Sequence, residues 1–186
     1  MTSSTTSRLP LLNAADAPAA SRPLLDAVHG AFGATPNMFR AVANSPAALQ
    51  AMWGFFGALG GGTLSPRLGE QIAVAVADRN GCEYCLAAHT VLGRKAGASA
   101  EEMSAAQAGE SADPATAAAL RFALRVVEQR GQVAEGDVAA LRAAGFDDGQ
   151  VVEILAHVAL NLFTNYVNVA FSVPVDFPGV KLRRAA

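Results

Sequence analysis

Four residues whose side chains can take part in thiol chemistry lie within one stretch of the chain, from Glu70 to His89. Cys82 and Cys85 are the only two cysteines and form a Cys-x-x-Cys pair. The histidine lies four residues after the second thiol, and the glutamate lies twelve residues before the first. The thiolate is the nucleophilic form of cysteine, and a helix N-terminus, an adjacent imidazolium and a neighbouring thiol each favour it. The spacing therefore predicts a redox-active pair, in which one thiol converts the oxidised form of the other into a disulfide.

The same residues permit other interpretations. Cys-x-x-Cys with a histidine supplies three of the ligands that zinc prefers, but the chain has no second Cys-x-x-Cys or His-x-His element to complete a site. The cysteines can also be small buried hydrophobic residues of a non-redox binding or assembly protein. Covalent haem attachment requires a histidine directly after the pair, where this chain has Leu86. We therefore expect neither a bound metal nor a cofactor.

Two predicted helices position the four residues. Ser65-Pro66 has the form of an N-cap followed by proline at the first helical position, which predicts a helix to about Ala77. The segment Asp-Arg-Asn-Gly at 78–81 breaks this helix. A second helix is expected from about Cys82 to Ala96, where a glycine follows. The two helices form a hairpin.

The geometry of this hairpin can be counted from the sequence. Glu70 and His89 lie roughly eight to nine residues from the turn, which puts both side chains about 12–14 Å down the hairpin and level with each other. Cys82, Cys85 and His89 share one helix face because they are three and four residues apart. The helix around Glu70 is apolar on every side, so its carboxylate is expected to be buried and to need His89 as a partner.

The spacing also suggests a role for each residue. Cys85 is the better candidate for the attacking thiolate because it lies one turn from His89, and Cys82 is then the resolving thiol. Glu70 would orient His89 and favour its cationic form. The opposite assignment of the thiols stays open, since Cys82 lies nearer the helix N-terminus and can be the more exposed. Tyr84, between the two cysteines, is a further candidate for the pocket.

The rest of the chain reads as helices joined by loops. Nothing alternates with the period of a strand over a convincing length, so we predict an all-α fold, a single-domain helical bundle with the Cys-x-x-Cys hairpin at its centre. Residues 1–20 are expected to form a flexible or extended N-terminal arm, 21–178 the helical domain and 179–186 a C-terminal tail. Cap and proline signals place the starts of the other helices near residues 22, 37, 46, 100, 114, 137 and 148.

The last expected helix carries a polar stripe on an apolar background. Its members recur at intervals of four, four, four and three residues and are Glu153, His157, Asn161, Asn165 and Asn168. One interpretation is a hydrogen-bonded seam between helices or subunits. The other is that His157 or an asparagine such as Asn161 lines the thiol pocket.

Composition narrows the class of protein. The chain has 186 residues, enough for one domain with a sizeable core, and is 52% hydrophobic with only 16% charged residues. Some of the apolar surface is therefore expected to meet another subunit. The net charge of −2 offers no basic patch for nucleic acid, and no apolar run reaches the roughly 18–20 residues of a membrane span. The start of the chain does not read as a secretory signal, so a cytoplasmic protein is expected.

The spacing Glu-x11-Cys-x2-Cys-x3-His resembles the alkylhydroperoxidase D-like branch of the carboxymuconolactone decarboxylase family. Within this branch, the chain resembles the peroxidase-related subgroup. It extends through TPNMFRAVANSPAAL (35–49), NGCEYCLAAHTVLGRKAG (80–97) and HVALNLFTNYVN (157–168). The resemblance implies an all-helical fold and a homo-oligomer, either a trimer or a hexamer.

The resemblance also implies a thiol peroxidase or a disulfide relay, with a small hydroperoxide as substrate and a dithiol or protein reductant as electron donor. Glu70, Cys82, Cys85 and His89 match the motif one by one. The best-studied peroxidases of the family carry a histidine where this chain has Tyr84, so their full proton relay does not transfer. Decarboxylases of the family generally lack the paired cysteines, which disfavours decarboxylation here. Decarboxylation or isomerisation of a small acid stays as the alternative function.

Overall fold

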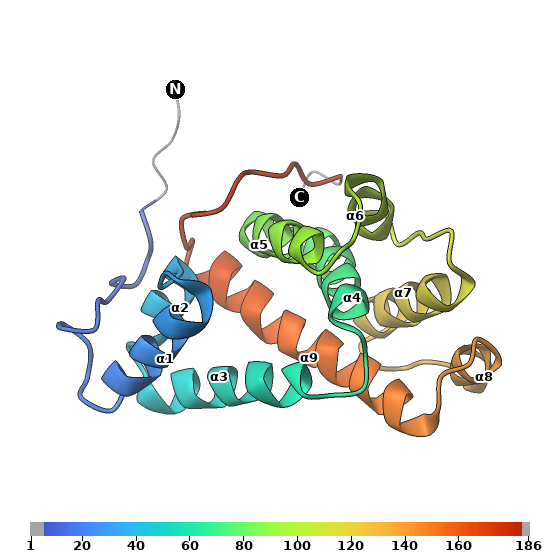
Figure 1. Ribbon diagram of the computed structural model, residues 1–186, viewed down its shortest axis with the longest axis horizontal. Helices are drawn as coiled ribbons and strands as arrows, with labels where there is room; N and C mark the ends of the chain where they lie inside the picture. The colour runs from blue at the N-terminus through green and yellow to red at the C-terminus, as the bar shows by residue number, and fades with distance from the viewer. Residues whose placement is uncertain (1–5, 184–186) are drawn as a thin grey trace.

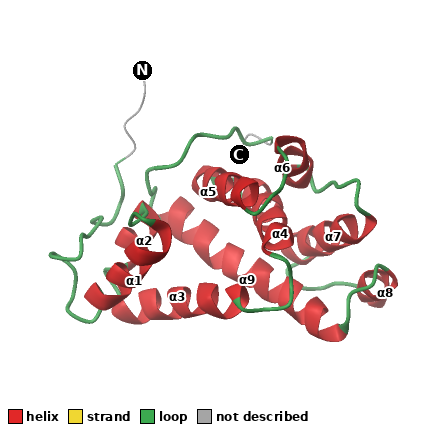
Figure 2. Cartoon of the chain, in the orientation of Figure 1, coloured by secondary structure: helices red, strands yellow, loops and turns green. Residues whose placement is uncertain are grey.

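All regular structure in residues 6–183, the part of the chain that the computed structural model describes, is α-helical (Figures 1 and 2). The predicted all-α fold is confirmed. None of these helices combines the length and the hydrophobicity that a membrane span requires. The helices are α1 (Arg22–Phe32), α2 (Asn37–Val42), α3 (Pro46–Gly60), α4 (Pro66–Arg79), α5 (Glu83–Lys95), α6 (Ala100–Gln107), α7 (Pro114–Glu128), α8 (Glu135–Ala143) and α9 (Asp148–Ala170).

The hairpin of α4 and α5 lies at the centre of the bundle. α4 packs against α5, α6, α7 and α9, so neighbours cover its whole circumference. This coverage explains why the sequence of α4 is apolar on every side. Complete burial of a side chain such as Ile72 stabilises the fold by about 1.5–3 kcal/mol. α9, the longest helix, runs past both helices of the hairpin (Figure 1).

One glycine permits the close packing of the hairpin on α6. A Cβ atom at Gly93 would lie 2.4 Å from Cε of Met103 and 3.3 Å from Cβ of Glu70. Carbon atoms do not approach to 2.4 Å without overlap, so a larger residue here would displace the end of the Met103 side chain. The absence of a side chain at this point therefore leaves room for Met103 beside the hairpin at the level of Glu70.

Three helices begin with the cap-and-proline pattern expected from the sequence. The side chains of Ser45, Ser65 and Asp113 each accept a hydrogen bond from the backbone N–H three residues further on. Ser99 and Glu102 form the predicted capping box of α6. Each cap satisfies an N–H group that has no partner inside its helix, and the predicted starts of these helices are confirmed.

α4 continues two residues beyond its predicted end at Ala77. The carboxylate of Asp78 is buried and accepts hydrogen bonds from Gln107 Nε2 at 2.7 Å and from the backbone N–H of Arg183 at 2.8 Å. These donors offset the cost of burying the charge, so a polar residue that reads as a helix breaker stays inside the last turn.

α8 begins at Glu135, two residues earlier than expected. Asp137 does not cap the helix. It lies in the first turn, where its carboxylate accepts a hydrogen bond from the backbone N–H of Ala134 at 2.9 Å. An acidic side chain is stabilised by any of the free N–H groups of a first turn, so the sequence signal identified the turn but not its first residue.

The segment before α1 follows an extended path along the helical body. The backbone N–H of Arg8 donates to the carbonyl oxygen of Phe171 at 2.8 Å, and that of Leu12 donates to a carbonyl oxygen of α2 at 3.2 Å. Residues 1–5 of the predicted arm lie outside the described residues. The rest of the arm is thus hydrogen-bonded to helices at both ends of the chain.

The segment after α9 passes above α5 and reaches α6 (Figure 1). This tail, residues 173–183, is held near its start by the backbone N–H of Asn37, which donates to Asp176 at 2.7 Å. Near its end Arg183 donates from its guanidinium to the carbonyl oxygen of Ser104 at 2.9 Å. Residues 184–186 of the predicted tail lie outside the described residues. The tail therefore covers the cysteine-bearing helix.

Candidate active site

The two cysteines lie at the turn of the hairpin, where α5 begins. Cys82 is the N-cap residue, and its Sγ accepts a hydrogen bond from the backbone N–H of Cys85 at 3.4 Å. Gly81, with a φ of 66°, supplies the left-handed residue that the turn requires. Both thiols are free, and the exposed fractions of Cys82 and Cys85 are 1% and 2%. Exposure therefore does not favour Cys82 as the attacking thiol.

Glu70 and His89 meet across the hairpin at the level expected from the sequence. His89 Nδ1 lies 2.7 Å from Glu70 Oε2, with the histidine buried and the glutamate half-buried. Burial disfavours the imidazolium, but the charge of Glu70 and its hydrogen bond outweigh burial and raise the pKa of His89 above its ordinary value. The histidine therefore keeps its positive charge to higher pH than a free histidine does.

The side chain of Cys85, on α5 of the hairpin, contacts side chains of α9. Asn168 Nδ2 donates a hydrogen bond to Cys85 Sγ at 3.1 Å, and Thr164 Oγ1 lies 3.9 Å from the same sulfur. The pKa of Cys85 is lowered to about 6, first because the Cys82 thiol donates a hydrogen bond to its sulfur. Burial opposes this effect, whereas the charge of His89 and the amide of Asn168 add to it. The same hydrogen bond, together with burial, raises the pKa of Cys82, so at neutral pH the pair carries one thiolate, on Cys85.

His157 and Asn161 lie behind the Glu70–His89 pair rather than against the thiols. They line a cavity of ≈150 Å³ that reaches both members of that pair but neither cysteine. The His157 ring covers Gly69, where a Cβ atom would lie 2.9 Å from His157 Cε1. Burial is the main cause that lowers the pKa of His157. These two candidates from the polar stripe therefore adjoin the histidine of the site and not its sulfur atoms.

Sequence reasoning allowed an asparagine of the stripe to line the thiol pocket but singled out Asn161 rather than Asn168, and it missed Thr164 as a neighbour of Cys85. Asn168 belongs to the polar stripe, so a signal was present, but the stripe does not say which member meets the sulfur. Thr164 carries no such signal. Asn165, another member of the stripe, accepts a hydrogen bond from Asn80 at the hairpin turn at 2.9 Å. The stripe is thus a hydrogen-bonded seam between helices and, at its C-terminal end, part of the surroundings of the thiol.

Tyr84 forms a wall of the site. Its hydroxyl oxygen accepts a hydrogen bond from the backbone N–H of Met38 at 3.2 Å, and its ring packs edge-on against Phe177 with centroids 5.7 Å apart. Burial raises the pKa of Tyr84, so it stays a neutral phenol. The residue that replaces the relay histidine of the family's peroxidases is therefore held by packing and by the backbone of α2.

Two cavities adjoin the cysteine pair, and among residues 6–183 Tyr84 alone lines both. The first is a small apolar pocket of ≈40 Å³ beside Cys85 and His89. Its wall is largely aromatic and includes Phe32, Phe39, Phe56, Tyr84 and Phe177. The second is larger, at ≈570 Å³, and is lined by Cys82, the end of α9 and the tail. The two sulfur atoms therefore face different surroundings.

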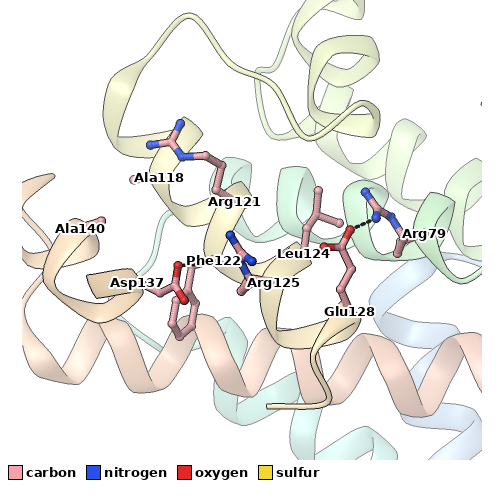
Figure 3. Close-up of a pocket in the computed structure, with 9 residues that line it drawn as sticks. All are labelled: Arg79, Ala118, Arg121, Phe122, Leu124, Arg125, Glu128, Asp137 and Ala140. Atoms are coloured by element: carbon pink, nitrogen blue, oxygen red, sulfur yellow. Dashed lines mark ion pairs between the residues drawn. The ribbon is translucent and has the colours of Figure 1, made fainter. Parts of the chain in front are cut away.

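A further surface cavity of ≈460 Å³ lies between α4, α7 and α8, away from the thiols (Figure 3). Four of its charged residues form ion pairs with one another, Arg79 with Glu128 and Arg125 with Asp137. None of the four motif residues lines it. The charges of this cavity hold helices together and take no part in thiol chemistry.

The zinc interpretation requires a cluster of ligands. Among residues 6–183, no three histidine, cysteine, aspartate or glutamate side chains lie close enough together to hold a metal ion. The two cysteines and His89 therefore do not form the ligand set that this interpretation needs.

Comparisons with known proteins agree with this geometry. Residues 46–129 match the carboxymuconolactone decarboxylase family, and no curated protein sequence matches the chain. A peroxidase-related protein from Silicibacter sp. TM1040 has a TM-score of 0.82 and 25% identity, over 94% of this chain and 95% of that one. An alkylhydroperoxidase AhpD core protein from Ralstonia eutropha JMP134, also called peroxidase-related, has a TM-score of 0.79 and 29% identity, over 91% and 92% of the two chains.

The fold also occurs in a protein with another activity. The debrominase Bmp8, crystallised with 2,3,4-tribromopyrrole, has a TM-score of 0.76 and 21% identity, over 95% of this chain and 93% of that one. At this identity the likeness shows the fold alone. The matched residues 46–129 contain the whole Glu-x11-Cys-x2-Cys-x3-His pattern, and the fold agrees along nearly the full chain. Residues 46–129 therefore belong to the carboxymuconolactone decarboxylase family, and the chain as a whole has the fold of the alkylhydroperoxidase D-like, peroxidase-related proteins.

Proposed function

We propose that the protein is a thiol-dependent oxidoreductase that reduces small organic hydroperoxides through Cys85 and Cys82. The setting of Cys85 carries the proposal. Its sulfur accepts a hydrogen bond from Asn168 at 3.1 Å, and the charge of the Glu70-paired His89 helps to lower its pKa to about 6. A cysteine of this kind is a thiolate at neutral pH, and the thiolate is the form that attacks peroxides.

The first step consumes the peroxide. The Cys85 thiolate attacks the terminal oxygen of ROOH, an S–O bond forms, and the O–O bond breaks. The departing alkoxide takes a proton from the His89 imidazolium and leaves as ROH, so that Cys85 becomes a sulfenic acid. Glu70, 2.7 Å from the imidazole, orients it and stabilises its cationic form.

The second step forms the disulfide. The Cys82 sulfur attacks the sulfenic sulfur of Cys85, an S–S bond forms, and the S–O bond breaks. The hydroxide that leaves takes the proton of the Cys82 thiol and becomes water. A dithiol then returns the pair to its reduced form by donating two electrons and two protons, of which one goes to Cys82 and the other restores the His89 imidazolium.

The pocket beside Cys85 supports an organic hydroperoxide over hydrogen peroxide. Its wall consists of aromatic and aliphatic side chains, and His89 is its only ionisable residue apart from Cys85 and Tyr84. Such a wall binds an alkyl or aryl group by removing apolar surface from water. The decarboxylase alternative has less support, because the cation of this wall, His89, is already paired with Glu70 and the rest of the wall is mostly apolar.

The protein is further proposed to self-associate through the outer face of α9, which we define as its stripe of large exposed apolar side chains. These are Val152, Leu155, Phe163, Tyr166 and Val169. A contiguous apolar stripe on a helix is typical of a surface that another protein covers. The proposed occupant is a second copy of the chain, in the trimer or hexamer that family membership implies. A pair that cycles between thiol and disulfide suits a reducing compartment, so the cytoplasm is the expected location.

The test is an assay of hydroperoxide consumption with tert-butyl hydroperoxide, cumene hydroperoxide and hydrogen peroxide, each with several dithiol donors. The wild type should turn over the organic peroxides, Cys85→Ser should lose the reaction, and Cys82→Ser should stop after one sulfenic acid per chain. Mass spectrometry of the oxidised wild type should show the loss of two hydrogens per chain. The proposal would be wrong if Cys85→Ser consumed hydroperoxide as fast as the wild type, or if oxidation formed mainly disulfides between chains.

A further inference from the structure

The tail supplies one side of the apolar pocket beside Cys85. Among the described residues that line this pocket, Phe177 alone comes from the tail. The others belong to α1, α2, α3 and α5 or, in Pro36, to the N-cap of α2. Packed helices hold their side chains in place, whereas a segment without regular structure opens at a lower cost in free energy. Phe177 is therefore the part of the wall that moves most easily.

The closed pocket is too small for a substrate. Its volume is ≈40 Å³, whereas small-molecule sites typically have roughly 300–1,000 Å³. Cys85 and His89 are 2% and 9% exposed. A hydroperoxide that carries an alkyl or aryl group does not fit beside the sulfur in this state. Part of the wall must therefore move before the thiolate attacks.

Phe177 is held in the wall by two contacts near the start of the tail. Its ring packs edge-on against the Tyr84 ring, with centroids 5.7 Å apart. The neighbouring Asp176 carboxylate accepts a hydrogen bond from the backbone N–H of Asn37 at 2.7 Å. Asp176 is exposed, and water competes for a hydrogen bond at the surface. The contact that holds Phe177 in place therefore opens easily.

The tail is also held on both sides of these contacts. Before them, Asn37 Nδ2 donates to the carbonyl oxygen of Pro174 at 3.1 Å. After them, the backbone N–H of Arg183 donates to the buried Asp78 carboxylate at 2.8 Å. A hydrogen bond to a buried charged group is stronger than one at the surface. The two ends of the tail therefore stay bound when its middle moves.

The middle of the tail is loosely held. Residues 177–180 form no hydrogen bond within the part of the chain that the structure describes. A Cβ atom at Gly179 would have no atom within 4 Å, so open space surrounds this residue. A glycine in open space accommodates a change of backbone direction, as hinge residues do. The tail can therefore bend at Gly179 without breaking other contacts.

We propose that Phe177 is a lid over Cys85 and His89 and determines the size of the group that reaches the thiolate. For entry, the hydrogen bond between Asp176 and Asn37 opens, the tail bends at Gly179, and the Phe177 ring leaves the wall. When the ring returns, it excludes water from the reacting groups. The chemical class of the admitted group, a hydroperoxide, rests on the proposed function, whereas closure over Cys85 does not.

The first experiment measures entry with two reagents that differ in size. Reduced protein is alkylated at pH 8 with N-methylmaleimide or N-phenylmaleimide, and each rate is divided by that of free cysteine. Cleavage after Glu83 places the two cysteines on different peptides. Phe177→Ala should speed the phenyl reagent at Cys85 at least about tenfold and the methyl reagent less than about threefold, because it enlarges the pocket. No acceleration, or equal acceleration of both reagents, would overturn the proposal.

Three further variants separate the lid from the rest of the tail. Phe177→Tyr keeps the ring and should keep the wild-type rates. Asp176→Ala removes the carboxylate that holds the lid and should speed the phenyl reagent about threefold. Val180→Ala is the matched control, since Val180 packs on the core from the tail but does not line the pocket, and it should change neither rate. Acceleration by Val180→Ala equal to that by Phe177→Ala would show that general loosening of the tail, not the lid, exposes the thiol.

A second assay connects the lid to turnover. Phe177→Ala should raise kcat/KM for cumene hydroperoxide at least about fivefold relative to tert-butyl hydroperoxide, because the two peroxides differ by a phenyl group in place of a methyl group. Alkylation that depends on Phe177 without any hydroperoxide consumption would refute the proposed function and leave the lid standing. Hydroperoxide turnover with an unchanged size preference in Phe177→Ala would refute the lid and leave the proposed function standing.

Discussion

The two faces of α9 depart from the usual arrangement of a surface helix, because polar side chains share the buried face with apolar ones such as Ile154 and Val158. Four polar residues of its C-terminal half point inward and are at most 3% exposed, namely Asn161, Thr164, Asn165 and Asn168. Five large apolar residues form the outer face and are at least 38% exposed, namely Val152, Leu155, Phe163, Tyr166 and Val169. A helix on a globular protein normally buries its apolar side chains and exposes its polar ones.

The buried polar side chains on the inner face of α9 form hydrogen bonds to the thiol site and to the hairpin turn. Asn168 donates to the Cys85 sulfur, and Asn165 bonds the hairpin turn through Asn80. Some polar atoms stay unsatisfied among the described residues, including Oδ1 of Asn161 and of Asn168. Each such atom costs about 1–3 kcal/mol, which a helix selected for stability alone would avoid. The inner face therefore trades stability for a polar wall beside the thiolate, and the outer face carries the apolar surface of the proposed subunit interface.

The largest expected effect comes from placing a charge on the inner face. In the wild type, alkylation of Cys85 should rise as the pH rises through about 6, because only the thiolate reacts. Asn168→Asp removes the donor and puts a carboxylate beside the sulfur, which should raise the pKa of Cys85 by about two pH units and leave roughly 50-fold less thiolate at pH 6. The measurement is the pH dependence of alkylation, with Cys82 and Cys85 separated by cleavage after Glu83.

Two variants of the same helix sharpen this result. Asn168→Leu removes only the donor and should shift the curve by about one pH unit, which corresponds to the lower end of the roughly 1.5–3 kcal/mol that a hydrogen bond to a charged group contributes. Tyr166→Phe changes the outer face and should leave the curve in place. If Asn168→Asp alkylates like the wild type, the inner face does not set the chemistry of the thiol.

The outer face is tested by a charge that should act only on assembly. Tyr166 is 59% exposed, and Tyr166→Arg would place a cation in the proposed subunit interface. Burying an unpaired charge there should weaken self-association at least about tenfold. Light scattering across the micromolar range measures the mass, and the alkylation curve of Cys85 should not move. A wild type that is monomeric throughout that range would remove the assembly role of this face.

A smaller effect is expected from the partner of the thiol on α5. His89→Ala removes the positive charge near Cys85 and should raise the pKa of Cys85 by about one pH unit, roughly fivefold less thiolate at pH 6. Glu70→Gln should act in the same direction but less strongly, because it only lowers the pKa of His89. Alkylation of both variants at several pH values measures the order. A larger effect of Glu70→Gln would mean that the glutamate does not act through the histidine.

The smallest expected effect has the opposite sign. Thr164 donates its hydroxyl proton to the carbonyl oxygen of Asn161 at 3.2 Å, so its oxygen faces Cys85 Sγ only as an acceptor, at 3.9 Å. An acceptor favours the protonated thiol. Thr164→Val should therefore lower the pKa of Cys85 by less than about half a pH unit, because a sulfur contact of this length is weak. A raised pKa would show that the hydroxyl donates to the thiolate instead.

The sequence by itself determined the hairpin and the meeting of Glu70 with His89. Both follow from local rules, since an α-helix advances about 1.5 Å per residue and a short turn aligns two helices from their shared end. The helix starts at Ser45, Ser65 and Asp113 were equally predictable, because a cap is a contact between residues three apart. Boundaries without a cap of this kind, such as the end of α4, depended on residues far along the chain.

Only the tertiary structure decided which part of α9 meets the thiols. Asn168 and Cys85 lie 83 residues apart, and their contact depends on how α9 crosses the hairpin. That crossing is set by the packing of side chains from several helices, so the spacing of the stripe could not tell Asn168 from His157 or Asn161. The opposite pKa shifts of the two cysteines have a mixed origin. Their first cause, the hydrogen bond between the two thiols, joins residues three apart, and the amide of Asn168, which packing places beside Cys85, lowers the pKa of that sulfur further.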